Sequence, residues 1–259
     1  MTSIVKGESD MEKNLPILEL RGICKYFGGI HALEDVDFSV CPQEVVALVG
    51  DNGAGKSTLI KIIAGVHYPT RGEIYWQGEK VEINSPQDAR NLGIETVYQE
   101  LALVETRDVP TNFFLGREPT RGKWKIFVDH KKMTEETTKT LQDLGVTIPR
   151  LNTLVRYLSG GQRQSLAIGR IIPWGGKVII MDEPTAALGV KESRRVLDLV
   201  RQLKEKGCSV IIISHNLRHV FSVADRIVVL RGGRKVGEKK KEETTMDEIV
   251  KLMVGAEML

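Results

Sequence analysis

The sequence has few cysteines, and their arrangement argues against two kinds of cysteine site. Its 259 residues contain only Cys24, Cys41 and Cys208, and none of them has the C-x-x-C spacing. An odd number of widely separated cysteines is not the pattern of a disulfide framework or of a structural zinc site. We therefore expect reduced thiols in a cytosolic protein.

Long apolar runs and a strong charge imbalance are also missing. No run approaches the ~18 apolar residues that a membrane-spanning helix needs. Residues 1–14 are polar and charged and lack the apolar core of a signal peptide. The net charge of +3 is weak support for a polyanionic partner. We expect a soluble chain with no nucleic-acid partner, still able to dock on a membrane protein.

What is present is the composition of a globular protein. Hydrophobic residues make up 41% of the chain and charged residues 27%, which allows a sizeable core. The length suits one large domain or a core with a subdomain. We predict a loose tail over residues 1–14 and a single domain over residues 15–259, without internal repeats or low-complexity segments.

The most informative stretch is a phosphate-binding loop. Residues 50–58 fit the pattern G-x-x-x-x-G-K-[ST]. A run typical of a buried strand, Val45–Val49, precedes it, and a helical run follows it. Glycines let consecutive backbone N–H groups face one anion, and the helix start adds positive potential. The predicted nucleotide-binding residues here are Gly50, Asp51, Asn52, Gly53, Ala54, Gly55, Lys56, Ser57 and Thr58.

Chemistry assigns two of these side chains directly. Lys56 can reach the β- and γ-phosphates of ATP, and the Ser57 hydroxyl can bind Mg²⁺. The loop therefore predicts ATP as substrate and Mg²⁺ as its metal ion.

The regions on either side of the loop predict different kinds of structure. Strand patterns at residues 17–23, 36–40 and 73–83 predict an antiparallel sheet beside the nucleotide. Between the first two lies a predicted turn, Lys25–Gly29, whose aromatic pair could stack on a base or belong to the core. Residues from about 100 to 172 predict a mostly helical insertion, with a basic loop at Arg121–Lys125.

Three further motifs stand at the ends of predicted elements. The stretch Leu158–Gln162 precedes a helix predicted over residues 163–172, which makes a second anion site at a helix start. Asp182 and Glu183 follow the apolar strand 178–181, and His215 follows the strand 210–213. Ligand sites of open α/β sheets lie at the carboxyl ends of such strands.

Together these motifs resemble the ATP-binding subunit of an ABC transporter. They occur in that family's order: the phosphate loop, a glutamine after a strand, the signature Leu158–Gln162, the acid pair and the histidine. The resemblance covers nearly all of the chain from about residue 17. It implies an α/β fold, a P-loop NTPase core (ABC ATPase) with an antiparallel β subdomain and a helical subdomain.

The resemblance also implies a role for each residue. Glu183 would be the general base that polarises the attacking water, worth about 10²–10⁴ in rate. Asp182 would support Mg²⁺, and Gln99 would help to place Mg²⁺ and water. His215 would contact the γ-phosphate, and Lys56 would hold phosphates. Phe27 matches the family's base-stacking aromatic residue, with Tyr26 as the competing choice.

In the family the signature contacts the ATP of a second ATP-binding subunit. The residues that this assigns to nucleotide binding are Ser159, Gly160, Gly161 and Gln162. ATP would hold a head-to-tail dimer together, here a homodimer, and hydrolysis would open it. The chain departs from the family at Gly189, where an aspartate is usual, which puts that residue's contact across the dimer in doubt.

Several stretches, among them Val97–Leu101 and Phe114–Glu118, resemble the ATPases of bacterial ribose, xylose and fructose importers. This implies transmembrane permease subunits as partners and an external or periplasmic sugar-binding protein as an indirect one. It places the chain on the cytoplasmic face of the cell membrane. The alternatives are an ABC ATPase of a non-sugar transporter, a soluble ABC-type ATPase outside transport, and a phosphate-loop kinase.

Overall fold

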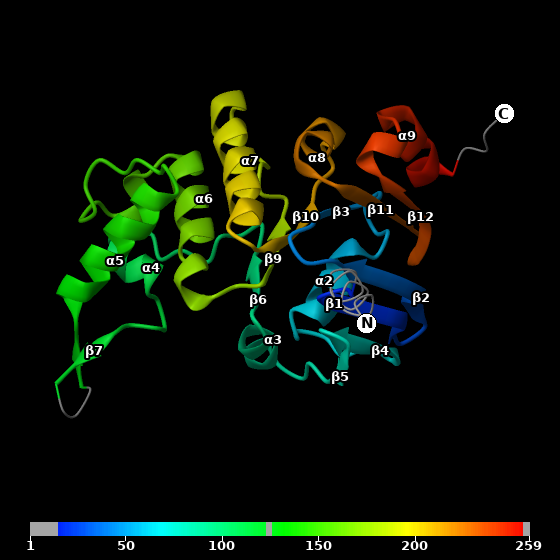
Figure 1. The fold of residues 1–259 in the computed structure, drawn as a ribbon, viewed down its shortest axis with the longest axis horizontal. Coiled ribbons are helices and arrows are strands. Elements are labelled where there is room, and N and C mark those ends of the chain that lie inside the picture. Colours follow the sequence, from blue (N-terminus) through cyan, green and yellow to red (C-terminus); the bar gives the residue numbers. More distant parts are fainter. Residues whose placement is uncertain (1–14, 123–125, 256–259) are drawn as a thin grey trace, which may run out of the picture.

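The computed structural model describes residues 15–122 and 126–255 (Figure 1). The predicted tail at residues 1–14 lies outside the described residues, as do residues 123–125 of the predicted basic loop and residues 256–259. None of the helices in the described ranges is both long enough and apolar enough to cross a bilayer.

The order of elements alternates between two sheets and the helices that cover them. The strands are β1 (Leu18–Phe27), β2 (Ile30–Val40), β3 (Val45–Val49), β4 (Arg71–Trp76), β5 (Glu79–Val81), β6 (Ile94–Val97), β7 (Thr120–Arg121), β8 (Phe127–Val128), β9 (Val178–Asp182), β10 (Ser209–Ile213), β11 (Arg226–Arg231) and β12 (Arg234–Lys240). The α-helices are α2 (Lys56–Ile63), α3 (Pro86–Leu92), α4 (Val109–Phe113), α5 (His130–Asp143), α6 (Gly160–Gly169), α7 (Val190–Glu205), α8 (Leu217–Val223) and α9 (Met246–Val254). Short 3₁₀ turns lie at Val155–Tyr157, Ile172–Trp174 and Lys241–Glu243.

The larger sheet has the order β12-β11-β3-β10-β9-β6, and every neighbouring pair except β11–β12 is parallel. Its inner strands are apolar apart from residues at their ends, because both faces are covered. Residues of α6, α7, α8 and α9 pack on one face, and α2 packs on the other. The predicted buried strands at residues 45–49, 178–181 and 210–213 are confirmed.

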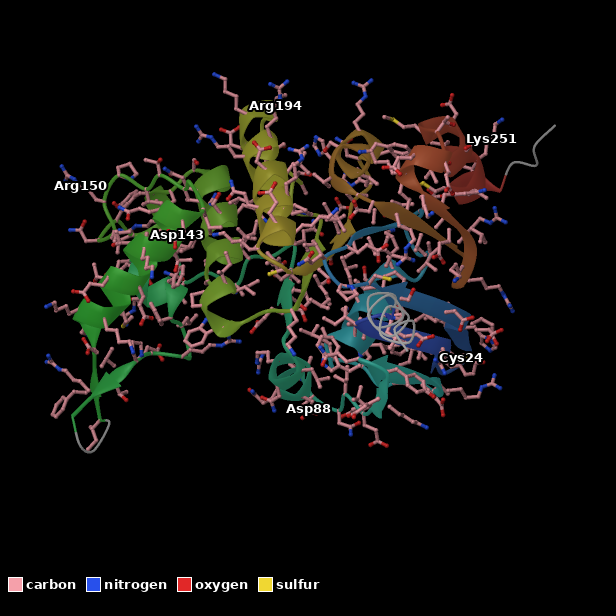
Figure 2. All side chains as sticks on the ribbon, viewed as in Figure 1. Cys24, Asp88, Asp143, Arg150, Arg194 and Lys251 are labelled. Atoms are coloured by element: carbon pink, nitrogen blue, oxygen red, sulfur yellow. The ribbon has the colours of Figure 1, made fainter. Side chains whose placement is uncertain are left out.

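The second sheet is antiparallel, with the order β2-β1-β4-β5, as predicted. Helix α2 lies between the two sheets and shares one core with both (Figure 1). Cys24 is buried in this region (Figure 2), and all three cysteines are free thiols. The predicted turn at Lys25–Gly29 is wrong in extent: Lys25, Tyr26 and Phe27 belong to β1, so only Gly28 and Gly29 turn the chain. Pairing with β2 extends the strand beyond its apolar alternation.

The region between β6 and β9 is mostly helical, as expected, with α4, α5 and α6 around a small core of their own. Two local details differ from the sequence prediction. A two-stranded hairpin, β7–β8, interrupts the helices. Helix α6 begins at Gly160, earlier than predicted, because Ser159 and Gln162 form a capping box that starts the helix there. The α/β fold class, with an antiparallel sheet and a helical part, is confirmed.

Candidate functional site

Parallel pairing gathers four of the predicted motifs at one edge of the larger sheet. Strands β3, β10, β9 and β6 are consecutive neighbours. In the register, Ile213 pairs with both Leu48 and Asp182, so these strands end at the same level. The phosphate loop, His215 and the acid pair leave these adjacent strand ends, and Gln99 follows β6 at the same edge. This is where ligands bind in open α/β sheets.

The phosphate loop has backbone conformations that only glycine adopts readily. Gly55, with φ 101°, is the N-cap of α2, which begins at Lys56. A Cβ atom at Gly50 would lie 2.2 Å from the carbonyl oxygen of Leu230. The Lys56 ammonium donates hydrogen bonds to the carbonyl oxygens of Gly50 (2.7 Å) and Asp51 (2.9 Å). The Lys56 side chain therefore folds back onto the loop that carries it. The unpaired N–H groups at the start of α2 remain available to an anion.

The charges around Lys56 favour a bound cation. Partial burial lowers the pKa of Lys56, while the nearby carboxylates of Glu183 and Asp182 oppose that shift. Burial raises the pKa of Asp182, and the neighbouring charge of Glu183 raises it further. The carboxylates of Glu183 and Asp182 thus lie near one ammonium, and the positive charge of Mg²⁺ would offset them. Ser57 and Asp182 supply the oxygen ligands that this ion prefers, so the residues present fit Mg²⁺.

The protein alone does not complete a metal site. Across residues 15–122 and 126–255, no group of three or more His, Cys, Asp or Glu side chains is arranged to hold an ion. A nucleotide-dependent Mg²⁺ site usually takes one or two carboxylates and completes its shell with phosphates and water.

Glu183 is held in a strained and specific arrangement. Its φ of 49° lies in the left-handed region, which is uncommon for a residue with a side chain. Its N–H donates to the carbonyl of Ile213 at 2.9 Å. Its Oε1 accepts the backbone N–H of His215 at 3.0 Å. Its Oε2 is buried and accepts no hydrogen bond from the described residues, although His215 Nδ1 lies 2.9 Å away. This oxygen therefore has acceptor capacity that the described residues do not use.

The two aromatic residues of β1 have different surroundings. The Tyr26 hydroxyl donates to Glu34 at 3.1 Å and accepts from Arg71 at 2.6 Å, so its ring is fixed within the sheet. Phe27 is 43% exposed and contacts His67 edge-on at a centroid distance of 5.3 Å. The exposed Phe27 ring is the better platform for a base.

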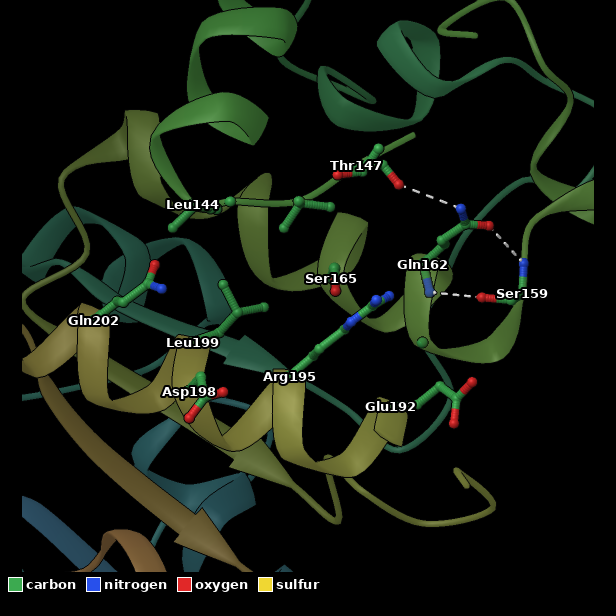
Figure 3. A pocket seen from close by; sticks show the side chains of 13 residues that line it. Leu144, Thr147, Ser159, Gln162, Ser165, Glu192, Arg195, Asp198, Leu199 and Gln202 are labelled. Carbon is green, nitrogen blue, oxygen red and sulfur yellow. Dashed lines mark hydrogen bonds between the residues drawn. The ribbon is translucent and has the colours of Figure 1, made fainter. Parts of the chain in front are cut away.

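The signature motif forms the start of α6, a separate place from the phosphate loop. Ser159 accepts the N–H of Gln162 at 3.2 Å, and Gln162 Oε1 accepts the N–H of Ser159 at 2.9 Å. Gln162 also donates to the Thr147 carbonyl at 3.3 Å (Figure 3). Its amide is therefore occupied within the subunit, while Ser159 is exposed. Figure 1 shows α6 beside α5 and α7, away from α2.

The signature glycines pack tightly against the segment that leads into α7. A Cβ at Gly160 would lie 3.1 Å from Leu188, and one at Gly161 would lie 2.7 Å from Glu192. Behind them α6 and α7 enclose a polar pocket of about 210 Å³ (Figure 3). The helix start is thus fixed by packing and by its cap, and the N–H groups of Gly160 and Gly161 have no partner among the described residues and can face an external anion.

Gln99 lies at the mouth of a second hollow that joins the sheet to the signature. It is exposed, two residues after β6. The hollow measures about 570 Å³ and is also lined by Gly160, Arg163 and Ala187. The structure therefore places Gln99 near the signature motif of its own subunit.

Gly189 stands where the family usually has an aspartate, and the structure shows which group lies in that space. Gly189 is the N-cap of α7 and provides no side-chain cap. The Oε2 atom of Glu192 lies 2.6 Å from the position that a Cβ at Gly189 would take. The carboxylate of Glu192 thus occupies the space that a side chain at residue 189 would need.

Two residues that the motifs do not single out lie directly behind the acid pair and the histidine. The Thr185 Oγ1 atom and the His219 Nδ1 atom are 2.9 Å apart, and Thr185 is only 7% exposed. Sequence reasoning gave no signal for this contact beyond the placement of His219 one helical turn after His215.

Comparison with known proteins agrees with this site. Residues 33–186 match the family described as ABC transporter. The chain is 53% identical to a xylose/arabinose import ATP-binding protein of Sulfolobus acidocaldarius over 92% of this chain and 94% of the relative. It is 47% identical to a fructose import ATP-binding protein of Rhizobium meliloti over 93% and 95%.

A dimeric post-hydrolysis structure of an ATP-binding cassette with ADP and Pi matches with a TM-score of 0.73 at 26% identity, over 86% of this chain and 98% of that one. The family match covers the phosphate loop, Gln99, the signature and the acid pair. The chain belongs to the ABC transporter family and is an ABC-type ATPase.

Proposed function

We propose that the chain is the ATP-hydrolysing subunit of an importer of monosaccharides. Two relatives of nearly the same length, at 53% and 47% identity, are named for the import of xylose or arabinose and of fructose. Such a subunit works beneath a membrane permease, peripherally, on the cytoplasmic face. An external sugar-binding protein delivers the sugar and acts on this chain only through the permease.

The observation that carries the proposal is the separation of two anion-binding helix starts. One, at Lys56, belongs to the phosphate loop. The other, at the exposed Ser159, begins α6, a helix that lies beside α7 and away from α2 (Figure 1). A single subunit offers the second helix start no phosphate of its own. A second copy, turned head to tail, brings its bound ATP to Ser159 and Gly161, so two nucleotides lie between two subunits. The dimeric relative bound to ADP and Pi supports this arrangement.

Each residue then has a defined task in hydrolysis. Phe27 stacks on the adenine base, and the phosphate loop with Lys56 holds the phosphates. Ser57, Asp182 and Gln99 would hold Mg²⁺, which would supply positive charge against the phosphates. The Glu183 carboxylate accepts a proton from the attacking water, and the imidazole of His215 contacts the γ-phosphate. The contacts between Glu183 and His215 hold the two side chains next to each other.

The experiment measures whether ATP makes the chain form a dimer. Glu183→Gln removes the base but keeps the shape, so ATP binds without being hydrolysed. We expect this variant to form a dimer with ATP and to remain a monomer with ADP, as measured by light scattering. Co-purification with a permease, and sugar-dependent stimulation of ATP hydrolysis in that complex, test the transport part. Full hydrolysis without a permease partner would instead favour a soluble ABC-type ATPase.

A further inference from the structure

His219, in the first turn of α8, contacts two segments of the site at once. Its Nδ1 atom lies 2.9 Å from Thr185 Oγ1, and its Nε2 atom lies 3.4 Å from Asn216 Nδ2. Thr185 follows Glu183 by two positions, and Asn216 comes directly after His215. The imidazole ring therefore spans the two loops that carry the proposed base and the proposed phosphate contact.

The hydrogen bonds around the ring define its tautomer. Asn216 caps α8, because its side-chain oxygen accepts the N–H groups of Arg218 (3.1 Å) and His219 (3.4 Å). The amide NH₂ of Asn216 must then face the ring, and it can only donate. Nε2 is therefore the unprotonated nitrogen, and Nδ1 carries the proton that is donated to Thr185. Turning the Asn216 amide over would remove the cap of α8.

The threonine at the other end is part of a strained segment. Glu183 has its positive φ of 49°, and Thr185 is buried at 7% exposure. A strained backbone conformation persists only where its surroundings hold it. From outside the segment, the Ile213 carbonyl holds the Glu183 N–H, and the His219 ring holds the Thr185 hydroxyl. Loss of the second bond would leave Glu183 freer to move.

We propose that His219 is a positioning residue for ATP hydrolysis. Its neutral ring fixes Thr185 against Asn216 and thereby sets the Glu183 carboxylate relative to His215. The inference rests on the proposed roles of Glu183 and His215, and it adds a residue that touches neither the nucleotide nor the reacting atoms.

The surroundings keep the ring neutral. Burial lowers the pKa of His219, and the nearby His215 lowers it further. The hollow between α7 and α8 that His219 lines contains three guanidinium groups and one carboxylate: Arg194, Arg201, Arg218 and Asp198. As the pH falls through the lowered pKa, the ring gains a proton on Nε2, and that N–H then points at the NH₂ of Asn216. Acidification therefore breaks the link between the two loops.

Steady-state kinetics of the intact protein test this link. His219→Ala and Thr185→Val should each lower kcat about tenfold while the KM for ATP changes less than about twofold. The double variant should lose no more than either single variant, because both remove the same bond. Two matched controls should keep the wild-type kcat: Thr185→Ser, which retains the hydroxyl, and His130→Ala, an exposed histidine on α5.

A pH profile separates positioning from a merely structural role. His219→Asn can donate to Thr185 as Nδ1–H does, but it does not titrate. It should restore kcat at about pH 8 and lack the part of the wild-type decline that sets in below about pH 6.5.

Three results would overturn the inference. One is a kcat within about twofold of wild type for both single variants, with only a lower melting temperature. The second is a double variant whose loss of kcat is the product of the single losses, and the third is a His219→Asn variant with the kcat of His219→Ala.

The kcat of Glu183→Gln is measured alongside. If it hydrolyses ATP normally, the proposed role of Glu183 fails and this inference fails with it. If it is inactive while the His219 variants are fully active, this inference alone fails.

Discussion

Replacement of Asn112 by alanine should strongly destabilise the helical part of the chain. Asn112 lies in α4 with 0% exposure. Its oxygen accepts the Val104 N–H at 2.6 Å. Its NH₂ group donates to the carbonyls of Val104 (3.0 Å), Arg107 (3.3 Å) and Asp108 (2.9 Å). One side chain thus holds the whole loop that connects the Gln99 segment to α4.

The expected cost can be worked out bond by bond. The three carbonyls keep other partners, because they also accept the N–H groups of Arg107, Val155 and Asn112 itself. Each of these lost bonds then costs about 0.5–1 kcal/mol. The Val104 N–H loses its side-chain partner, and leaving it unsatisfied costs about 1–3 kcal/mol. The free energy of unfolding should therefore fall by about 2.5–6 kcal/mol, or about 5–12 °C in melting temperature for a chain of this size.

Urea denaturation with linear extrapolation measures this change, and Asn152→Ala, at an exposed asparagine, is the matched control.

Asn112→Asp adds a second test, because its carboxylate faces three carbonyl oxygens and should be protonated in the folded state. Its stability should rise as the pH falls, since the folded state then binds more protons than the unfolded state. A loss below about 1 kcal/mol for Asn112→Ala, or a pH-independent deficit for Asn112→Asp, would refute the reasoning.

Three other substitutions probe separate parts of the account. Glu183→Gln should lower kcat by about 10²–10⁴ with ATP affinity unchanged, measured by phosphate release and by calorimetry; near-normal turnover would exclude Glu183 as the base. Phe27→Ala should weaken ATP binding roughly tenfold, whereas Tyr26→Ala should change it less than about twofold, and the reverse ranking would make Tyr26 the stacking residue. Glu44→Ala should destabilise the chain by about 3 kcal/mol in urea, because Glu44 binds the guanidinium of Arg226 through bonds of 2.7 and 2.8 Å; an unchanged midpoint would contradict this.

The sequence predicted the features that depend on local pattern. The apolar runs at Val45–Val49 and Val178–Met181 predicted buried strands, which the structure has, and the glycines of residues 50–55 predicted the loop that precedes α2. The motifs that follow predicted strands then pointed to the carboxyl ends of those strands, and parallel pairing brings these ends to one edge of the sheet.

Other features depend on contacts between distant residues and leave no local signal. Lys25–Phe27 became strand because β2 pairs with them, which the aromatic turn pattern did not indicate. The contact between Thr185 and His219 joins residues far apart in sequence, and no motif in the sequence links them. The place of Glu192 beside Gly189 follows from the geometry at the start of α7, which periodicity alone does not give.

The central claim is that each ATP is held by helix starts from two subunits, and one pair of substitutions at Ser159 tests it. Asparagine and aspartate are both good N-caps, so Ser159→Asn and Ser159→Asp should keep α6 intact. Only the aspartate places a negative charge where the partner's triphosphate is expected to lie. In the Glu183→Gln background with ATP, light scattering should show a dimer for Ser159→Asn and a monomer for Ser159→Asp, with equal ATP affinity in the monomer. Equal dimerisation of the two variants would contradict the account.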